Sequence, residues 1–332
     1  MTRSHLCLAV LLCASAGTSS AQGYQFTTLD PDRPYVTIIP NAINNSGTVT
    51  GVWVDPAQAD HGFIANAVAF TSFDAPQADT VKVGGVRGTW ASGLDSAGTL
   101  VGVYTAGGAQ HGFVRLADGT TATLDITGHS RTALTAINDN GQMLGVHADD
   151  NTLLGGTSFL RSAGGALTLI SMPGSIFSEA EGLNNDGVIV GGYDDAASVL
   201  HGYVRAPNGV FTSIEVAGAD TTVLSGINDA GWIVGEYDVG GVGHGFLRDP
   251  LGAVTTIDVP GASFTSAIGI NAAGAIVGQF CDAANVCHGF VAAPVPEPPG
   301  GALMAAGVGV VGLLLRRRTA RWRAQEACIG RA

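Results

Sequence analysis

The chain has 332 residues, a formal net charge of −12 and 13% charged residues, while 46% of its residues are hydrophobic and 49 are glycine. This composition excludes an intrinsically disordered chain, and the acidic balance excludes a nucleic-acid partner. Glycine at about one residue in seven, without a period of three, also excludes collagen.

The first 21 residues have the layout of a secretory signal peptide. Arg3 precedes an apolar run from Leu6 to Ala14, and small residues follow up to Ala21. The run is shorter than the about 20 apolar residues that a membrane span needs. We therefore expect residues 1–21 to direct export and to be removed by cleavage between Ala21 and Gln22.

Residues 22–292 contain six copies of a motif, Ile/Leu-Asn/Asp-x-x-Gly, at successive spacings of 51, 43, 46, 44 and 43 residues. Each copy is followed by an alternating apolar segment, such as WIVGEYD after GINDAG, which predicts a strand. Asn and Gly favour a tight turn, so each copy predicts a hairpin. The asparagines of the motif are Asn44, Asn138, Asn184, Asn228 and Asn271.

Two further segments complete each unit. The first is His-Gly-aromatic, which the third copy replaces by Thr157, Ser158 and Phe159. The second is a Thr-rich apolar segment that ends in an acid in most copies, such as FTTLD (26–30) and VTTID (254–258). The histidines of the first segment are His61, His111, His201, His244 and His288.

Four short β segments in about 45 residues match the size and strand count of a propeller blade. We therefore predict an all-β repeat domain, a six-bladed β-propeller of four-stranded units. A β-solenoid is the second choice, and two three-unit sandwiches are the third. One domain of six units replaces the two domains that length alone suggests.

The pattern does not show which strand begins a blade, because the number of units between Phe26 and Val291 is whole. If the boundary falls inside the unit, the segment from Phe26 to Asp30 joins the last blade and closes the ring.

The repeat resembles the HAF family of probable extracellular repeats, which combines a Gly-Ile-Asn-x-x-Gly-x-Ile-Val-Gly core with a His-Gly/Ala-Phe element. The clearest copy is SGINDAGWIVGEYDVGGVGHGFLR (225–248), and the resemblance covers nearly all of residues 25–292. It implies a location on the bacterial surface and brings no agreed activity.

The repeated histidines would form a circle in a closed ring, which raises a metal or ligand hypothesis. We favour a structural role in each blade, because no second ligand recurs at a fixed short spacing. The motif asparagines are the partners we expect for these histidines. The acidic turns, such as NDNG (138–141), do not fit a calcium loop. We predict no metal and no cofactor.

Cys281 and Cys287 flank the loop DAANV and should face each other across a hairpin. In an oxidising compartment they are expected to form a disulfide.

The sequence contains no nucleophile elbow, zinc-binding helix or phosphate loop, and no paired carboxylates in an irregular insert. We therefore expect a protein that is not an enzyme. The longest irregular stretch runs from Asp74 to Trp90 and includes Lys82 and Arg87, which makes it the best candidate for a distinctive binding feature.

Residues 293–332 begin with a Pro-rich break and continue with an apolar stretch from Gly300 to Leu315. Pro296, Glu297 and Pro298 precede that stretch, and Arg316, Arg317 and Arg318 follow it. This segment resembles the PEP-CTERM sorting signal of Gram-negative bacteria. The resemblance implies a short transmembrane helix, transient inner-membrane anchoring and cleavage by an exosortase. The tail from Thr319 to Ala332 is longer than is usual for that signal.

The combined expectation is a non-catalytic exported protein of the bacterial surface or extracellular matrix, associated with exopolysaccharide or biofilm. Exosortase and the secretion machinery are its expected partners. Once both ends are removed, the body carries a net charge of −17. The alternatives are a polysaccharide hydrolase or lyase, which is least favoured, and a carbohydrate-binding module. The module would use the aromatic residues after Val-Gly, which are Trp53, Tyr104, Tyr193, Tyr237 and Phe280.

Overall fold

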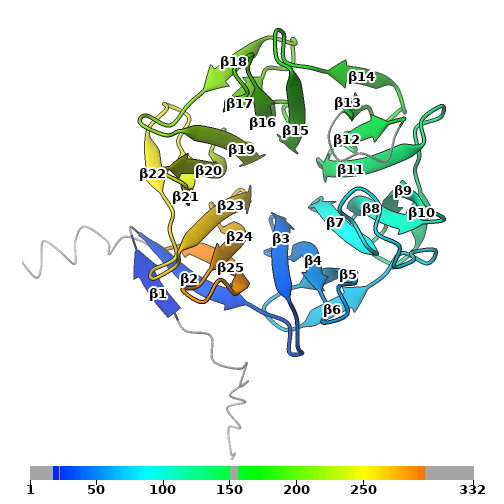
Figure 1. Ribbon diagram of the computed structural model, residues 1–332, viewed down its shortest axis with the longest axis horizontal. Coiled ribbons are helices and arrows are strands. Elements are labelled where there is room, and N and C mark those ends of the chain that lie inside the picture. The colour runs from blue at the N-terminus through cyan, green and yellow to red at the C-terminus, as the bar shows by residue number, and fades with distance from the viewer. Residues whose placement is uncertain (1–17, 22, 150–155, 296–332) are drawn as a thin grey trace, which may run out of the picture. The chain divides into compact units, whose positions relative to one another are not determined.

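The computed structural model describes residues 18–21, 23–149 and 156–295. Contacts divide the chain into Met1–Ala293 and Pro294–Ala332. The first unit is a ring of radially arranged β-sheets, a β-propeller (Figure 1). Four sheets have four strands each, and a nine-stranded sheet contains two more blades, which a parallel bridge between Cys287 and Thr37 joins. The described residues therefore form six blades.

The first strand of each blade lines the centre of the ring (Figure 1). Each of these six strands carries a β-bulge near its end, for example between Ala180 and Gly182. A bulge re-aims a side chain, so the extra residue turns toward the centre. In blade order the strands are β3 (Thr37–Ile43), β7 (Thr89–Leu94), β11 (Arg131–Ile137), β15 (Phe177–Leu183), β19 (Thr221–Ile227) and β23 (Phe264–Ile270).

The second and third strands follow in antiparallel order. The Asn-x-x-Gly motif makes the turn into the second strand, and its glycines, such as Gly47 with φ of 79°, adopt the left-handed backbone that the turn requires. The second strands are β4 (Val49–Val54), β8 (Leu100–Ala106), β12 (Met143–Ala148), β16 (Ile189–Asp194), β20 (Ile233–Val239) and β24 (Ile276–Cys281). The third strands are β5 (Asp60–Ala65), β9 (Ala109–Arg115), β13 (Thr157–Arg161), β17 (Leu200–Arg205), β21 (Val242–Arg248) and β25 (Cys287–Pro294).

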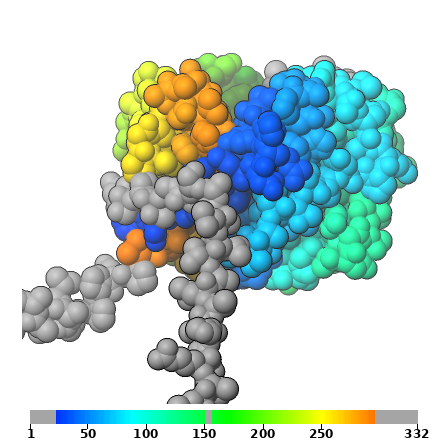
Figure 2. All heavy atoms as spheres, turned by 90° about the horizontal axis from the view of Figure 1, so that it is seen from below, coloured from blue at the N-terminus to red at the C-terminus, as the bar shows by residue number. Residues whose placement is uncertain are grey.

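The outer strand of the sixth blade comes from the other end of the chain. β2 (Tyr24–Leu29) pairs with β25, so the N-terminal Thr-rich segment closes the ring as the sequence suggested. Figure 2 shows the blue N-terminal residues against the orange sixth blade. β1 (Thr18–Ala21) adds an antiparallel partner to β2. The other outer strands are β6 (Phe70–Phe73), β10 (Thr121–Thr123), β14 (Leu167–Ile170), β18 (Phe211–Ile214) and β22 (Val254–Thr256).

The core of each blade contains one aromatic ring opposite a glycine. Tyr203 of β17 lies opposite Gly191 of β16, and a Cβ at Gly191 would overlap the carbonyl of Glu179 and crowd the tyrosine ring. Glycine is therefore required, and the ring covers the space it leaves. The equivalent rings are fully buried, and they are Phe63, Phe113, Phe159, Phe246 and Phe290.

The propeller class is thus confirmed, and the solenoid and the pair of sandwiches are excluded. Within the described residues no helix is long and apolar enough to cross a membrane. The predicted apolar stretch Gly300–Leu315 and the arginines that follow lie outside the described residues.

Loss of β2 should open the ring. A chain that begins at Gln22 keeps β2, whereas one that begins at Asp32 lacks it and exposes the edge of β25. The shorter chain also loses Phe26, which is 3% exposed, and a buried Phe alone contributes about 3–5 kcal/mol. We expect the shorter chain to melt at lower temperature and to associate through its free edge, as measured by circular dichroism and size-exclusion chromatography. Equal melting temperatures for the two chains would contradict a role for β2 in closing the ring.

Candidate functional site

Each of the five repeated histidines contacts the acidic residue that follows the outer strand of its own blade. Nδ1 lies 2.8–3.1 Å from a carboxylate oxygen in all five. The contact ties the end of the outer strand to the third strand. The pairs are His61–Asp74, His111–Asp125, His201–Glu215, His244–Asp258 and His288–Asp30.

The aromatic residues of the second strands stack on these histidines. The ring centroids are 4.7–5.3 Å apart, with interplanar angles of 24–30°. Four of the five also bond the outer strand, as Tyr104 does through its hydroxyl to Thr123 at 2.7 Å and Trp53 through Nε1 to Ser72 at 2.9 Å. Because their faces and polar ends are engaged within the blade, these residues are not free platforms for a sugar ring.

The expected partnership between the repeated histidines and asparagines is wrong, because the asparagines lie at the inner turns and bond the neighbouring blade. Each Nδ2 donates to the carbonyl of the equivalent residue one blade on, at 3.0–3.2 Å. Each Oδ1 accepts backbone N–H groups of its own turn, as Asn44 does from Ser46 and Thr48. The asparagines thus close the turns as expected and also join the blades.

This asparagine belt lacks one side-chain amide, at the junction of the second and third blades. The second blade has Asp95 in place of asparagine, and Asp95 has no amide to donate. Asp139 of the third blade instead accepts from the backbone N–H and the hydroxyl of Ser96, at 2.7 and 2.9 Å. Side-chain hydrogen bonds therefore also join the second and third blades.

The third blade replaces the histidine–acid pair by two histidines in close contact. His147 occupies the aromatic position, pairs across the strands with Thr157, and lies with its ring centroid 3.8 Å from that of His129. His129 in turn contacts Asp149 at 2.7 Å. Burial, with His129 as a further cause, lowers the pKa of His147.

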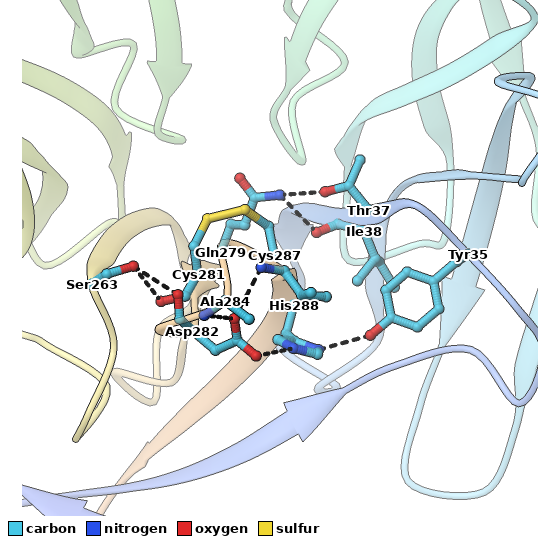
Figure 3. Close-up of a disulfide and its surroundings, with 11 residues drawn as sticks. Tyr35, Thr37, Ile38, Ser263, Gln279, Cys281, Asp282, Ala284, Cys287 and His288 are labelled. Atoms are coloured by element: carbon cyan, nitrogen blue, oxygen red, sulfur yellow. Dashed lines mark hydrogen bonds and ion pairs between the residues drawn. A yellow bond between two sulfur atoms is a disulfide. The ribbon is translucent and has the colours of Figure 1, made fainter.

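The sixth blade adds several contacts at the closure. Tyr35 contacts Nδ1 of His288 at 2.7 Å (Figure 3). Asp30 contacts the same Nδ1 at 3.1 Å. Gln279 donates to Thr37 of the first blade. Cys281 and Cys287 form a disulfide between the paired ends of β24 and β25, with their Cα atoms 4.0 Å apart (Figure 3). This closure cluster fastens the two ends of the ring.

The long irregular stretch between Asp74 and Trp90 packs on the first blade. Val83 and Val86 are buried, and the backbone N–H of Arg87 donates to Asp60 at 2.7 Å. Lys82 is exposed, whereas Trp90 lines the central channel. Only the tryptophan of this stretch therefore faces the ring centre.

The central channel holds a chamber of about 510 Å³. A ring of six aliphatic side chains separates it from a smaller cavity of about 90 Å³ beside the asparagine belt. The chamber wall combines short polar side chains with Trp90, Glu179 and Glu181. The six aliphatic residues are Ile43, Leu94, Ile137, Leu183, Ile227 and Ile270.

Glu179 and Glu181 place two carboxyl groups in this chamber from one strand, β15. Glu181 is the bulge residue, so both side chains line the channel. Burial, and then the charge of Glu179, raise the pKa of Glu181 to about 8. Burial also raises the pKa of Glu179, against the opposing effect of Arg131. The fourth blade therefore presents two carboxyl groups with raised pKa values, and that of Glu181 is high enough to keep it protonated at neutral pH.

The sequence analysis missed these two glutamates. The signal was present as SEAEG (178–182), where the other inner strands carry apolar or small polar residues. Across the described residues, no group of three His, Cys, Asp or Glu side chains could hold a metal ion. Gln22 and the sorting residues Pro296, Glu297, Pro298 and Arg316–Arg318 lie outside the described residues, while Ala21 ends β1.

No protein-family model and no curated protein matches the chain. Several solved structures are similar to this chain. TolB from Acinetobacter baumannii has a TM-score of 0.52 and 13% identity, over 75% of this chain and 64% of TolB. Virginiamycin B lyase from Staphylococcus aureus has a TM-score of 0.47 and 11% identity, over 80% and 88% of the two chains. The β-propeller domain of the Trilobed protease from Pyrococcus furiosus has a TM-score of 0.49 and 8% identity, over 80% and 97%. At these identities the likeness concerns the fold alone.

The closure cluster should make His288 more important than its equivalents. The His288–Asp30 contact joins residues 258 apart in the chain, whereas the His111–Asp125 contact joins residues 14 apart. We expect His288→Ala to cost about 2 kcal/mol of unfolding free energy, through its hydrogen bonds and its stacking on Phe280. His111→Ala is the matched control and should cost less. Urea denaturation measures both, and an equal loss would refute a special role for the closure.

Glu181 should make stability fall as the pH rises. Its pKa of about 8 in the folded protein exceeds the ordinary 4.5, so the folded state keeps a proton that the unfolded chain has released between these values. Glu181→Gln stays neutral at every pH. The variant should match the wild type in melting temperature at about pH 4, below the ordinary pKa, and exceed it at about pH 9. Glu215→Gln, at the edge of the same blade, is the control, and a Glu181→Gln effect that does not vary with pH would contradict the assignment.

Proposed function

We propose that the protein is a non-catalytic, exported propeller of the bacterial surface or extracellular matrix. A PEP-CTERM-type signal would sort it, an exosortase would cut it, and the released body would associate with exopolysaccharide or biofilm. The disulfide between Cys281 and Cys287 is the observation that carries this proposal.

The disulfide supports export because such bonds persist in oxidising compartments and are rare in the cytosol. It closes a loop with a sequence separation of 6, for which the chain-entropy model gives about 2 kcal/mol. Cys287 also pairs with Thr37 at the junction of the last and first blades. The bond therefore adds its stability at the ring closure, where an open edge would be exposed.

In the sequence, the proposed processing points flank the segment that contains the blade strands. Cleavage after Ala21 would remove β1 and leave β2, which begins at Tyr24. At the other end, β25 ends at Pro294, two residues before Pro296. Both cuts would thus release a body with every blade strand in place, which supports a chain that is processed at both ends.

The repeated side chains support a non-catalytic role for the blades. The histidines are paired with acids, and the asparagines join neighbouring blades. The aromatic residues proposed for the carbohydrate-binding alternative are stacked on those histidines. These positions therefore favour the surface-protein proposal over a sugar-binding or hydrolytic role at the repeat.

The sorting proposal is tested by changing the Pro-Glu-Pro triplet. Glu297→Ala combined with Pro298→Ala should leave the full-length precursor in the inner membrane, because the exosortase would not recognise it. Pro299→Ala is the matched control, since it changes the adjacent proline and keeps the triplet. Fractionation and immunoblotting measure the precursor and the released body. Normal release of the double variant would overturn the sorting proposal.

A further inference from the structure

The six blades can be compared position by position. In this comparison the fourth blade differs from the other five in the residues that line the central chamber. The position of Glu179 is filled in the other inner strands by Ile39, Trp90, Ala133, Val223 and Ser266. The bulge position of Glu181 is filled by Asn41, Ser92, Thr135, Ser225 and Ile268. Both carboxyl groups at these positions therefore come from one blade, and the fold does not require them.

The core aromatic residue deviates in the same blade. Tyr203 replaces the phenylalanine of the other five, and its hydroxyl is buried with no hydrogen-bond partner among the described residues. Such a buried hydroxyl costs about 1–3 kcal/mol. Five phenylalanines show that a blade packs without it, so this blade has gained a polar group at a cost in stability.

The ring of Tyr203 packs toward the strand that carries the two glutamates. The tyrosine ring extends from β17 across Gly191 of β16 toward the backbone of Glu179 on β15. Burial, and then the charges of Glu181 and Glu179, raise the pKa of Tyr203. The unpartnered hydroxyl and the carboxyl pair therefore belong to one cluster, which we call the blade-four cluster.

The chemistry of the blade-four cluster fits a cation that has groups to hydrogen-bond. Two carboxyl groups on one strand repel each other when ionised, and a positive charge between them would relieve both that repulsion and the cost of their burial. Arg131 acts on Glu179 only in part and does not line the chamber. A bound metal ion is not favoured, because the described residues offer no group of three acidic, His or Cys side chains.

The rest of the chamber fits an organic molecule of moderate size. Its volume of about 510 Å³ lies within the range of about 300–1,000 Å³ for small-molecule sites. Asn41, Ser92, Thr135 and Ser225 surround the level of Glu181 with short polar side chains that suit hydroxyl groups. Trp90 adds an aromatic side chain to the wall.

We propose that the chamber binds a small hydroxyl-bearing molecule with a protonated amine, of the amino-sugar class. The ammonium group would lie between Glu179 and Glu181, with the buried Tyr203 packed behind the strand that carries them, and the hydroxyl groups would contact the polar bulge residues. This site is separate from the sorting signal and does not depend on it.

Calorimetric titration of the purified chain with glucosamine tests the charge requirement. N-acetylglucosamine is the matched probe, since it keeps the sugar ring and removes the positive charge. We expect glucosamine to bind at least about tenfold more tightly, which corresponds to about 1.4 kcal/mol. The proposal would be overturned if the two sugars bound with equal affinity, if glucosamine did not bind, or if calcium chloride competed with glucosamine for the site.

Variants locate the site. Glu181→Gln should weaken glucosamine binding at least about tenfold, whereas Glu215→Gln, which removes the same charge at the edge of the blade, should not change it. Tyr203→Phe restores the residue of the other blades and should fold at least as stably as the wild type, while it weakens glucosamine binding. Unchanged affinity in both Glu181→Gln and Tyr203→Phe would exclude the blade-four cluster as the site. A sorting defect would not alter any of these titrations, so the two proposals fail independently.

Discussion

The close approach of an aromatic ring to a glycine across two strands is the contact on which every blade depends. At Gly235 and Gly278, as at Gly191, an added Cβ would overlap a carbonyl of the inner strand and press on the ring of the third strand. The inner strand can therefore pack against the second strand only where the side chain is missing. This constraint explains why glycine recurs in a chain that is otherwise rich in β-branched residues.

The inner strands then determine what the channel can present. Their bulges direct one residue per blade to the centre, and the asparagine belt holds the turns beyond them. Because the scaffold is repeated and rigid, a substitution at a bulge changes the chamber without changing the blade. Glu181 is such a substitution, and Tyr203 accompanies it within the same sheet. A propeller of this kind gains a distinctive site by departing from its repeat.

The repeat made the fold predictable, since turn residues, strand period and unit length all indicated four-stranded blades. The strand that begins each blade was not predictable, because in a closed ring of repeats any of the four strands could come first. The pairing of β2 with β25 decides between them. The partners of the histidines were mistaken for a related reason. His111 and Asp125 are 14 residues apart and meet only because the third and outer strands pair. The carboxyl groups of the chamber were overlooked because comparing the repeat copies reveals residues that recur. Glu179 and Glu181 occur in one copy only.

The ring closure has a mechanical consequence. In the precursor, which the proposal anchors at its C-terminus until the exosortase cuts it, a pull on the body would enter through β25, the strand that precedes the anchor. β25 lies between β24 and β2, and the disulfide joins its first residue to the end of β24. The load would therefore be shared by the hydrogen bonds that β25 makes to β24 and to β2, which are loaded in shear. The disulfide would prevent the first residue of β25 from separating from β24. The blade that joins the two ends of the chain is thus also the blade that would bear tension while the precursor is still held in the membrane.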